Sequence, residues 1–400
     1  MNDSTIQVAL VPTRSELQQA IHGKVLEVVK ALLDAELTAF LGSEPYERTQ
    51  ARRGYRHGAE SRRLTTQHGP VEVLVPRGRL RQPDGSTSEF QSTVLPRYSR
   101  RTRQADEAIL GAYLAGANTR RIRKALEPLL GEANLSKSAV SRVVGQLKGL
   151  FASWDSRDLS TERFAILYLD AKNLKVRLAR RVIKVPVLVA LGVEPDGTKH
   201  LVALRLAVRE TGASWRELVE DLQRRGLREP MLIVSDGHPG LAKAVELWPS
   251  SRVQRCTVHK RRNLLEHCPK HAHAELCRDY HRIIYARDAM AARGAFDAFV
   301  TKWQRLCPAV AKSLVEAGGK LLTFYELPRP MWRSLRSTNT IENLNREFER
   351  RTKTQASFPT EEAAVTLLYG LVAFGQIRFR RIDGWQHLST VIEQHWKEVA

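Results

Sequence analysis

The chain has 400 residues and a formal net charge of +21, because its 64 Lys and Arg residues outnumber its 43 Asp and Glu residues. With 42% hydrophobic residues it is long enough to bury two or three cores, and its four cysteines are too few for a disulfide scaffold. The longest apolar candidate, residues 185–193, is interrupted by Pro186 and Gly192, so no membrane-spanning segment is expected.

The positive charge favours a partner that is itself a polyanion. Duplex DNA is a dense line of phosphates, and Lys and Arg side chains that neutralise them gain free energy from counterion release. A pI near 10.2 therefore predicts a nucleic-acid partner, although basic proteins with other roles exist. Residues 1–5 lack the charged and apolar regions of a signal peptide, so we expect a cytoplasmic protein that joins the nucleoid when bound to DNA.

Residues 1–103 form the first predicted region, an N-terminal helix followed by a basic segment that contains β-structure. Apolar positions in residues 17–41 recur at helical spacing and predict an amphipathic helix that packs on a core or on a partner helix. Residues 46–103 are rich in arginine and include an alternating stretch at 71–75. We predict a small β unit with a DNA-facing surface; a flexible charged connector is the alternative. The candidate DNA contacts are Arg48, Arg52, Arg53 and Arg56.

Residues 104–155 form the second predicted region, a helical DNA-binding domain of helix-turn-helix type. Apolar residues make one face around Ile109 and a second around Ile122, Gly131 closes the second helix, and Ser136 is a candidate N-cap for the third. The third helix presents polar side chains near its beginning, where recognition helices meet base edges. A three-helix core with an ordinary polar surface explains the same spacing. The candidate base-reading residues are Lys137, Ser138, Ser141 and Arg142.

Beyond residue 160 the hydrophobic pattern becomes that of an α/β fold. A hairpin turn at Pro195-Asp196-Gly197 joins the second and third predicted strands, and a helix from Ser214 to Gly226 leads to the fourth. Three strands, a crossover helix and a parallel strand describe a ribonuclease-H-like layered sheet, in which the first and fourth strands can lie side by side. The predicted strands are residues 164–178, 182–193, 201–208 and 231–235.

Three acidic residues stand out in this half of the chain. Asp170 and Asp236 each follow a short apolar run, and Glu342 lies near the start of a helix otherwise rich in arginine. Mg²⁺ prefers carboxylate oxygens, and two such ions activate the attacking oxygen and stabilise the leaving oxygen when a phosphodiester is cleaved. The trio therefore predicts a two-metal site that acts on nucleic acid, with Asp170 bridging both ions and Mn²⁺ able to replace Mg²⁺.

Each of these carboxylates also has an ordinary structural interpretation. Asp170 can cap a turn, and Asp236 lies in a Ser-Asp-Gly sequence that is typical of a turn after a strand. Residues 339–342, Asn-Thr-Ile-Glu, fit the capping-box pattern, in which the fourth residue bonds back to the helix cap. The trio is more specific than its members, because strand acid, strand acid and helix acid follow in that order within one α/β pattern.

The helix around Glu342 also predicts cations beside the metal site. Arg346 and Lys353 fall on roughly the same angular face of the helix as Glu342, which would bring them near a bound phosphate. The opposite, buried side of this helix is predicted to consist of Ile341, Leu344 and Phe348.

Several motifs match one known family in the correct order. They are Tyr168-Leu169-Asp170, Val234-Ser235-Asp236-Gly237-His238, Cys256-Thr257-Val258-His259 and Ile341-Glu342-Asn343-Leu344-Asn345-Arg346, together with Gly54-Tyr55-Arg56-His57-Gly58 in the N-terminal part. Over most of its length the chain resembles the Mutator family of transposases, and among bacterial elements the insertion-sequence-two-fifty-six type. The resemblance implies a DDE transposase with Asp170, Asp236 and Glu342 as the acidic triad, Mg²⁺ as cofactor and an N-terminal region that recognises terminal inverted repeats.

The resemblance also implies how the catalytic domain is divided. A helical insertion at 263–335 interrupts the ribonuclease-H-like domain, whose first part is 160–262 and whose second part, 336–400, carries the Glu helix and the C-terminal tail. Cys256 and His259 are implied to belong to a family motif near the active site. The residues that we expect to support the active site are His238, Cys256, His259 and Asn339. For His238 an exposed turn histidine is the alternative.

A zinc site is a second interpretation of the Cys and His residues. Cys256-x-x-His259 and Cys268-x-x-His271 supply two pairs at the short spacing that structural zinc sites use. The pattern, however, falls across a predicted strand and the start of a helix, which does not suit a compact zinc module.

We therefore expect a transposase that cuts DNA at the element ends and joins the freed 3′-hydroxyl to target DNA, both at one two-metal site. Because two ends have to be joined, a homodimer or higher homo-oligomer on DNA is the mechanistic expectation. One alternative is a nuclease of the same fold that does not join strands. Another is a non-catalytic DNA-binding regulator derived from a transposase, which an intact acidic triad argues against.

Overall fold

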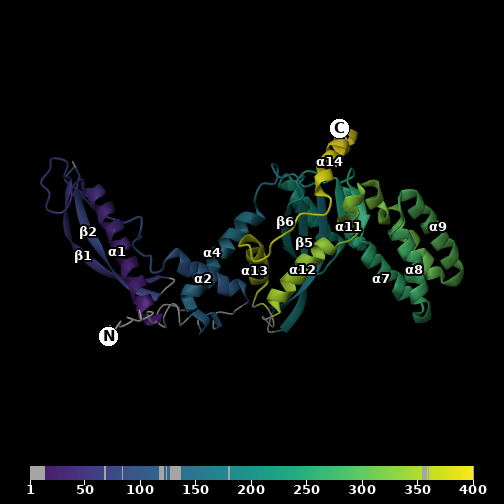
Figure 1. The fold of residues 1–400 in the computed structure, drawn as a ribbon, viewed down its shortest axis with the longest axis horizontal. Helices are drawn as coiled ribbons and strands as arrows, with labels where there is room; N and C mark the ends of the chain where they lie inside the picture. Colours follow the sequence, from purple (N-terminus) through teal and green to yellow (C-terminus); the bar gives the residue numbers. More distant parts are fainter. Residues whose placement is uncertain are drawn as a thin grey trace, which may run out of the picture. The chain divides into compact units, whose positions relative to one another are not determined.

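The computed structural model describes residues 14–66, 69–82, 84–116, 121–122, 124–126, 137–178, 181–353, 358 and 360–399. The chain divides into two compact units, Met1–Gly145 and Gln146–Ala400, and each has its own β-sheet (Figure 1). Among the helices in the described ranges, none is both long and apolar enough to cross a membrane.

The first unit begins with a helix packed on a three-stranded antiparallel sheet. Helix α1 (Arg14–Leu41) lies against strand β2, so its apolar face covers a core within the unit. The prediction of a small β unit is confirmed, and the alternative of a flexible connector is wrong, because alternating side chains of 71–75 point into that core. The strands are β1 (Gly54–Thr66), β2 (Gly69–Arg81) and β3 (Thr87–Glu89). The core residues are Leu33, Leu64, Val71, Val73 and Leu95.

Helices follow the small sheet. In α2 (Arg103–Leu114) the side chain of Thr102 caps the first turn by accepting a hydrogen bond from the N–H of Ala105. Residues 121–122 and 124–126 are helical, and α4 (Lys137–Asp155) comes next. Five residues share a buried cluster: Ala105, Ile109, Ile122, Val140 and Val143. The predicted cap Ser136 and the stop signal Gly131 lie outside the described residues, so the helix-turn-helix stays a prediction.

The second unit is built around a five-stranded sheet of order β6-β5-β4-β7-β8. β4, β5 and β6 are antiparallel neighbours, whereas β7 runs parallel to β4 and β8 runs parallel to β7. The predicted adjacency of the first and fourth strands is therefore confirmed. The third strand begins and ends slightly earlier than predicted, because the Gly197 N–H to Glu194 O bond of 2.8 Å closes a tight turn before it. The strands are β4 (Ile166–Leu178), β5 (Arg181–Val193), β6 (Lys199–Leu206), β7 (Leu232–Ser235) and β8 (Arg252–Arg255).

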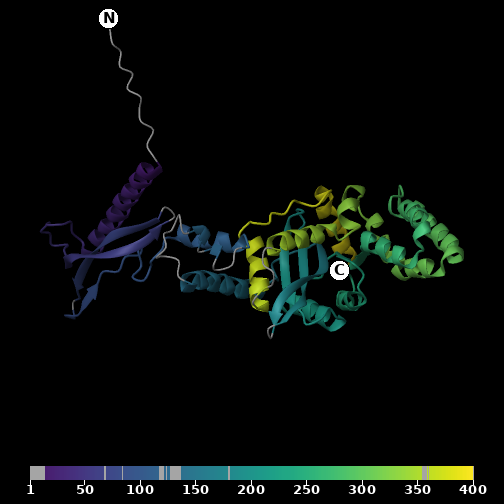
Figure 2. The same cartoon turned by 90° about the horizontal axis from the view of Figure 1, so that it is seen from below.

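Helices lie on both faces of this sheet (Figure 2). Leu167 and Leu169 of β4 point to the face covered by α5 (Gly212–Arg224) and α6 (Pro239–Ala244). Because side chains alternate along a strand, Tyr168 and Asp170 point to the opposite face, where α12 (Asn339–Thr352) packs on β4. The alternation thus places Asp170 under α12. Two further helices complete this part, α13 (Glu361–Ala373), which contacts β4 and β6, and α14 (Leu388–Val399).

Between β8 and α12 the chain forms a helical segment, and the bounds 263–335 of a separate insertion stay a prediction. Its own core includes Leu276, Phe299 and Trp303. Arg255 of β8 joins this segment to the sheet by donating from Nη1 to Glu316 Oε2 at 2.7 Å, and the almost fully buried Lys260 donates to the same oxygen at 2.9 Å. The helices are α7 (Thr257–His267), α8 (His273–Ile284), α9 (Ala289–Leu306), α10 (Pro308–Ala317) and α11 (Trp332–Leu335).

Candidate active site

Two carboxylates meet where strand β7 ends. Leu169 of β4 pairs with Ser235 of β7, so the next residues, Asp170 and Asp236, follow at the same level of the sheet. Strand β4 continues beyond this point because it stays paired with β5, whereas β7 stops at Ser235. Asp170 is therefore held in the middle of a strand, and Asp236 begins a loop.

Asp170 lies in a surrounding that disfavours its negative charge. Burial and the nearby charge of Asp236 raise the pKa of Asp170 from 3.8 to about 7. Asn345 Nδ2 on α12 donates to Asp170 Oδ2 at 2.7 Å, while the buried Asn345 Oδ1 has no hydrogen-bond partner among the described residues. Two adjacent carboxylates and an unsatisfied amide oxygen fit a hard divalent cation, which would supply the missing positive charge.

The loop after β7 has a shape that only glycine permits. Asp236 Oδ1 accepts a hydrogen bond from the His238 N–H at 2.8 Å, which folds the loop back on the aspartate. Gly237 has φ +85°, and a Cβ there would lie 2.2 Å from Arg255 Nε. His238 Nδ1 accepts from the Gly240 N–H at 3.2 Å and caps α6. This placement agrees with the interpretation of His238 as a turn residue.

Glu342 reaches the site from the first turn of α12. Thr338 is the N-cap residue of the helix, but its side chain does not cap the first turn; its Oγ1 instead donates to Glu342 Oε1 at 2.8 Å. The capping-box interpretation is wrong, because the glutamate does not bond back to Asn339, which is exposed. The N–H of Thr338 donates instead to Cys256 Sγ at 3.3 Å. The charge of Glu342 also contributes to the raised pKa of Asp170.

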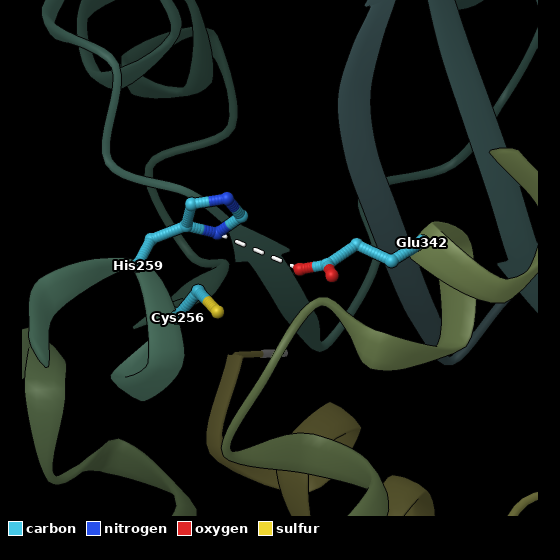
Figure 3. Close-up of side chains that lie close together, drawn as sticks. All are labelled: Cys256, His259 and Glu342. Atoms are coloured by element: carbon cyan, nitrogen blue, oxygen red, sulfur yellow. Dashed lines mark ion pairs between the residues drawn. The ribbon is translucent and has the colours of Figure 1, made fainter. Parts of the chain in front are cut away.

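Cys256 and His259 lie beside Glu342 (Figure 3). His259 Nδ1 is 3.7 Å from Glu342 Oε1, and the hydrogen bond to Cys256 raises the pKa of His259. Burial raises the pKa of the Cys256 thiol, but hydrogen bonds from His259 and Thr338 outweigh burial and leave it below its usual range. The ligand atoms of Cys256, His259 and Glu342 lie within 4.8 Å of one another, and the predicted second pair, Cys268 and His271, is not part of this cluster.

The cations predicted near Glu342 lie on the exposed side of α12. Arg346 is exposed and donates to Asn343 Oδ1, and Lys353 is exposed at the end of the helix. Lys172, two residues after Asp170, forms an ion pair with Glu349 at 2.6 Å. Contact of Arg346 and Lys353 with DNA stays a prediction.

The arginines predicted to bind DNA in the first unit largely hold a loop together. Arg48 is exposed in that loop, which joins α1 to β1. The loop is fixed by bonds from Arg52 Nε to Gly54 O at 2.9 Å, from Arg53 Nη2 to Ala39 O at 3.2 Å and from Arg56 Nη2 to Thr38 Oγ1 at 2.7 Å.

The candidate base-reading residues lie at the start of α4. Lys137 begins the helix, and Ser138, Ser141 and Arg142 are exposed.

Two residues of the site were not predicted from the sequence. Asn345 follows Glu342 by three positions, so both side chains leave one face of α12, and that spacing could have found it. Thr338 is a hydroxyl residue just before the helix, which is a signal for capping but not for contact with Cys256.

Comparisons with known proteins agree with one another. Residues 3–379 match the family described as "Transposase, Mutator family". The chain is 34% identical to the transposase for insertion sequence element IS905 of Lactococcus lactis, over 88% of this chain and 87% of that protein. It is 35% identical to the transposase for ISRM5 of Rhizobium meliloti, over 86% and 84% of the two chains. It is 30% identical to the transposase for IS256 in transposon Tn4001 of Staphylococcus aureus, over 85% and 86%.

The first test concerns the buried charge of Asp170. Because its pKa is about 7 when folded and near 3.8 when unfolded, the metal-free protein loses stability as pH rises between these values, and the loss is complete above pH 7. Replacing Asp170→Asn should raise the free energy of unfolding at pH 8 by about 2–4 kcal/mol, with the gain vanishing towards pH 4. Urea denaturation in the presence of EDTA measures the free energy of unfolding at each pH, and Asp297→Asn, at an exposed aspartate, is the control. A variant no more stable than the wild type at pH 8 would refute this electrostatic description.

Proposed function

Because this chain belongs to the Mutator family of transposases, we propose that it is a DNA transposase that binds the terminal inverted repeats of an insertion sequence. It catalyses metal-dependent strand cleavage there and transfers the freed 3′ end to target DNA. The observation that carries this proposal is that Asp170 and Asp236 follow paired residues of β4 and β7, and that the charges of Asp236 and of Glu342 on α12 both act on the buried Asp170. Among the described residues the ligand atoms that lie within 4.8 Å of one another are those of Glu342, Cys256 and His259, so the two aspartates are not part of that cluster.

We propose that the second unit is a ribonuclease-H-like catalytic domain with a helical insertion. Three antiparallel strands followed by two strands parallel to β4 support this assignment, and so does the helical segment between β8 and α12. The proposed division is 160–262 and 336–400 for the two parts of the catalytic domain and 263–335 for the insertion. The N-terminal part is proposed to comprise 1–103 and the helical DNA-binding domain 104–155.

Asp170, Asp236 and Glu342 are the residues that we propose to hold Mg²⁺, which Mn²⁺ can replace. All three offer only oxygen ligands, and the raised pKa of Asp170 shows how poorly the protein alone compensates these charges. When bound, two such ions lower the pKa of an attacking water or hydroxyl and stabilise the leaving oxygen of the phosphodiester.

The remaining side chains orient the carboxylates. The Asn345 amide fixes one oxygen of Asp170, so the other oxygen keeps its lone pairs for the site. The His238 N–H bond and the Arg255 guanidinium packed on Gly237 fix the loop that carries Asp236. A site held by its neighbours before the substrate arrives avoids the cost of reorganising during the reaction.

DNA binding is proposed to fall to the basic N-terminal unit and to the exposed cations of α12. Arg48, Arg142, Arg346 and Lys353 are exposed and can neutralise phosphates, whereas Arg56 is already held by Thr38. Joining two element ends requires two of them in one complex, so the active form is proposed to be a homodimer or higher homo-oligomer on DNA.

Two other functions are distinguishable from this one. A nuclease of the same fold would hydrolyse the element ends without forming joined products. A DNA-binding regulator would bind the ends without metal-dependent cleavage. Three carboxylates would only weaken such binding, because their negative charges repel a DNA phosphate.

The proposed chemistry predicts the loss of both steps when a metal-holding carboxylate is neutralised. Asp236→Asn and Glu342→Gln should each lower cleavage and strand transfer at least about 100-fold, because several kcal/mol of transition-state stabilisation disappear. DNA binding should be retained. The assay incubates each protein with Mg²⁺ or Mn²⁺ and labelled DNA that carries the flanking inverted repeats, and it quantifies the cleaved and the joined DNA.

Glu347→Gln is the matched control for this experiment, because Glu347 lies on the same helix and forms ion pairs with Arg350 and Arg351. Its activity should equal that of the wild type. Wild-type cleavage without any joined product would favour the nuclease, and binding without cleavage would favour the regulator. Full activity of either test variant would remove that residue from the site.

The proposed DNA interface predicts a salt effect for Arg142 at the start of α4. Arg142→Gln should weaken binding to the inverted repeats and make the plot of log K against log salt shallower by about 0.9, the share of one phosphate contact. Fluorescence anisotropy at several salt concentrations measures the slope. Arg216→Gln, on α5 and paired with Glu220, is the control. An unchanged slope for Arg142→Gln would place that arginine outside the interface.

A further inference from the structure

One hydroxyl group connects three ionisable side chains next to the proposed metal site. Thr338 Oγ1 lies 2.8 Å from Glu342 Oε1, 3.3 Å from His259 Nδ1 and 3.2 Å from Cys256 Sγ. Figure 3 shows the side chains of Cys256, His259 and Glu342 converging. Thr338 is fully buried, so water does not compete for these contacts. The hydroxyl is thus the common partner of the whole cluster.

The chemistry of the groups determines where the hydroxyl hydrogen points. A threonine hydroxyl has one hydrogen and two lone pairs, and an ionised carboxylate can only accept. The hydroxyl has two acceptors for its one hydrogen, Glu342 Oε1 at 2.8 Å and Cys256 Sγ at 3.2 Å, and the shorter contact to the charged oxygen is the stronger one. The hydrogen is therefore donated mainly to Glu342 Oε1, and a lone pair faces His259 Nδ1. A bond to a charged acceptor is stronger than one between neutral groups, so this contact holds one carboxylate oxygen and leaves the other for a ligand.

The backbone that carries Thr338 is itself held from two sides. The Thr338 N–H donates to Cys256 Sγ at 3.3 Å, and the Thr257 N–H donates to Arg336 O at 2.9 Å. Tyr168 on β4 donates its hydroxyl hydrogen to Ser334 O at 3.0 Å. The segment before α12 is therefore joined to the start of α7 and to the strand that carries Asp170. Because its backbone is held in this way, the Thr338 hydroxyl can fix the position of the Glu342 carboxylate.

We propose that Thr338 is the positioning residue for Glu342, and that Cys256 and His259 act through it by fixing the hydroxyl. Glu342 is then already oriented for metal before the metal arrives. The inference rests on the proposed role of Glu342 as a metal-holding residue. It gives the Cys-x-x-His motif a part in orienting a carboxylate, without a zinc ion. Groups that orient metal ligands typically change metal affinity 10- to 100-fold when they are removed.

The test is metal binding in the absence of DNA, so that it does not depend on activity. Mn²⁺ is titrated into the full-length protein, and free Mn²⁺ is followed by electron paramagnetic resonance. Thr338→Val keeps the shape of the side chain but removes the hydroxyl, and it should weaken Mn²⁺ binding about 10-fold. Thr338→Ser restores the hydroxyl and should bind Mn²⁺ as the wild type does.

Thr352→Val is the matched control, because Thr352 is a buried threonine of the same helix whose hydroxyl donates to Phe348 O at 2.8 Å. Its Mn²⁺ affinity should not change. The melting temperature of each metal-free variant establishes that it is folded. If Thr338→Val does not fold, Thr338→Ala replaces it with the same expectation, since alanine fits any space that threonine leaves.

The possible outcomes separate the inference from the proposed function. Wild-type affinity in a folded Thr338→Val or Thr338→Ala variant would overturn the positioning role and leave the proposed metal site intact. Equal weakening in Thr352→Val, or no recovery in Thr338→Ser, would also overturn it, because the effect would then come from helix packing. If the wild type binds no Mn²⁺, the proposed metal site itself fails.

Discussion

The parallel pairing of β4 with β7 is the constraint on which the candidate active site depends. It brings Asp170 and Asp236 to one level of the sheet, and the cover provided by α12 removes Asp170 from water. Two carboxylates so placed repel each other and lose hydration, which is costly unless a cation enters. Below pH 7 protonation of Asp170 removes this repulsion, and above pH 7 a bound cation can compensate the two negative charges. The proposed role of this pair as metal-holding residues follows from that cost, because metal ions stabilise the charges that develop when a phosphodiester is cleaved.

The third carboxylate is brought in by helix packing and not by the sheet. α12 lies on the face of β4 from which Asp170 projects, and Asn345 and Glu342 leave the same face of that helix. The starts of α7 and α12 are bonded to each other through Cys256, Thr257 and Thr338, so the helical segment and the sheet meet at the site. The position of the glutamate thus depends on segments that are distant in sequence.

Much of the sheet and the trio of acids followed from local patterns. Apolar runs that end in an acid marked Asp170 and Asp236, and a single acid at the start of a basic helix marked Glu342. The sequence placed the N-cap of α12 at Asn339, one residue too late, because Glu342 lies three positions after Asn339, which is the spacing of a capping box. In the structure the N-cap residue is Thr338, whose hydroxyl donates to Glu342 four positions later. The cluster of Thr338 with Cys256 and His259 could not be predicted, since it arises only when two helix starts meet in space. The shape of the Asp236 loop likewise depends on Arg255, which arrives from another strand.

The central claim is that Asp170, Asp236 and Glu342 together hold divalent metal. Its most direct test is a crystal structure of the protein grown with Mn²⁺ and DNA bearing the inverted repeats, measured at a wavelength where manganese scatters anomalously. The account predicts anomalous density next to the carboxylates of Asp170, Asp236 and Glu342. Density at Cys256 and His259 instead, or bound DNA with no density among the three carboxylates, would contradict it.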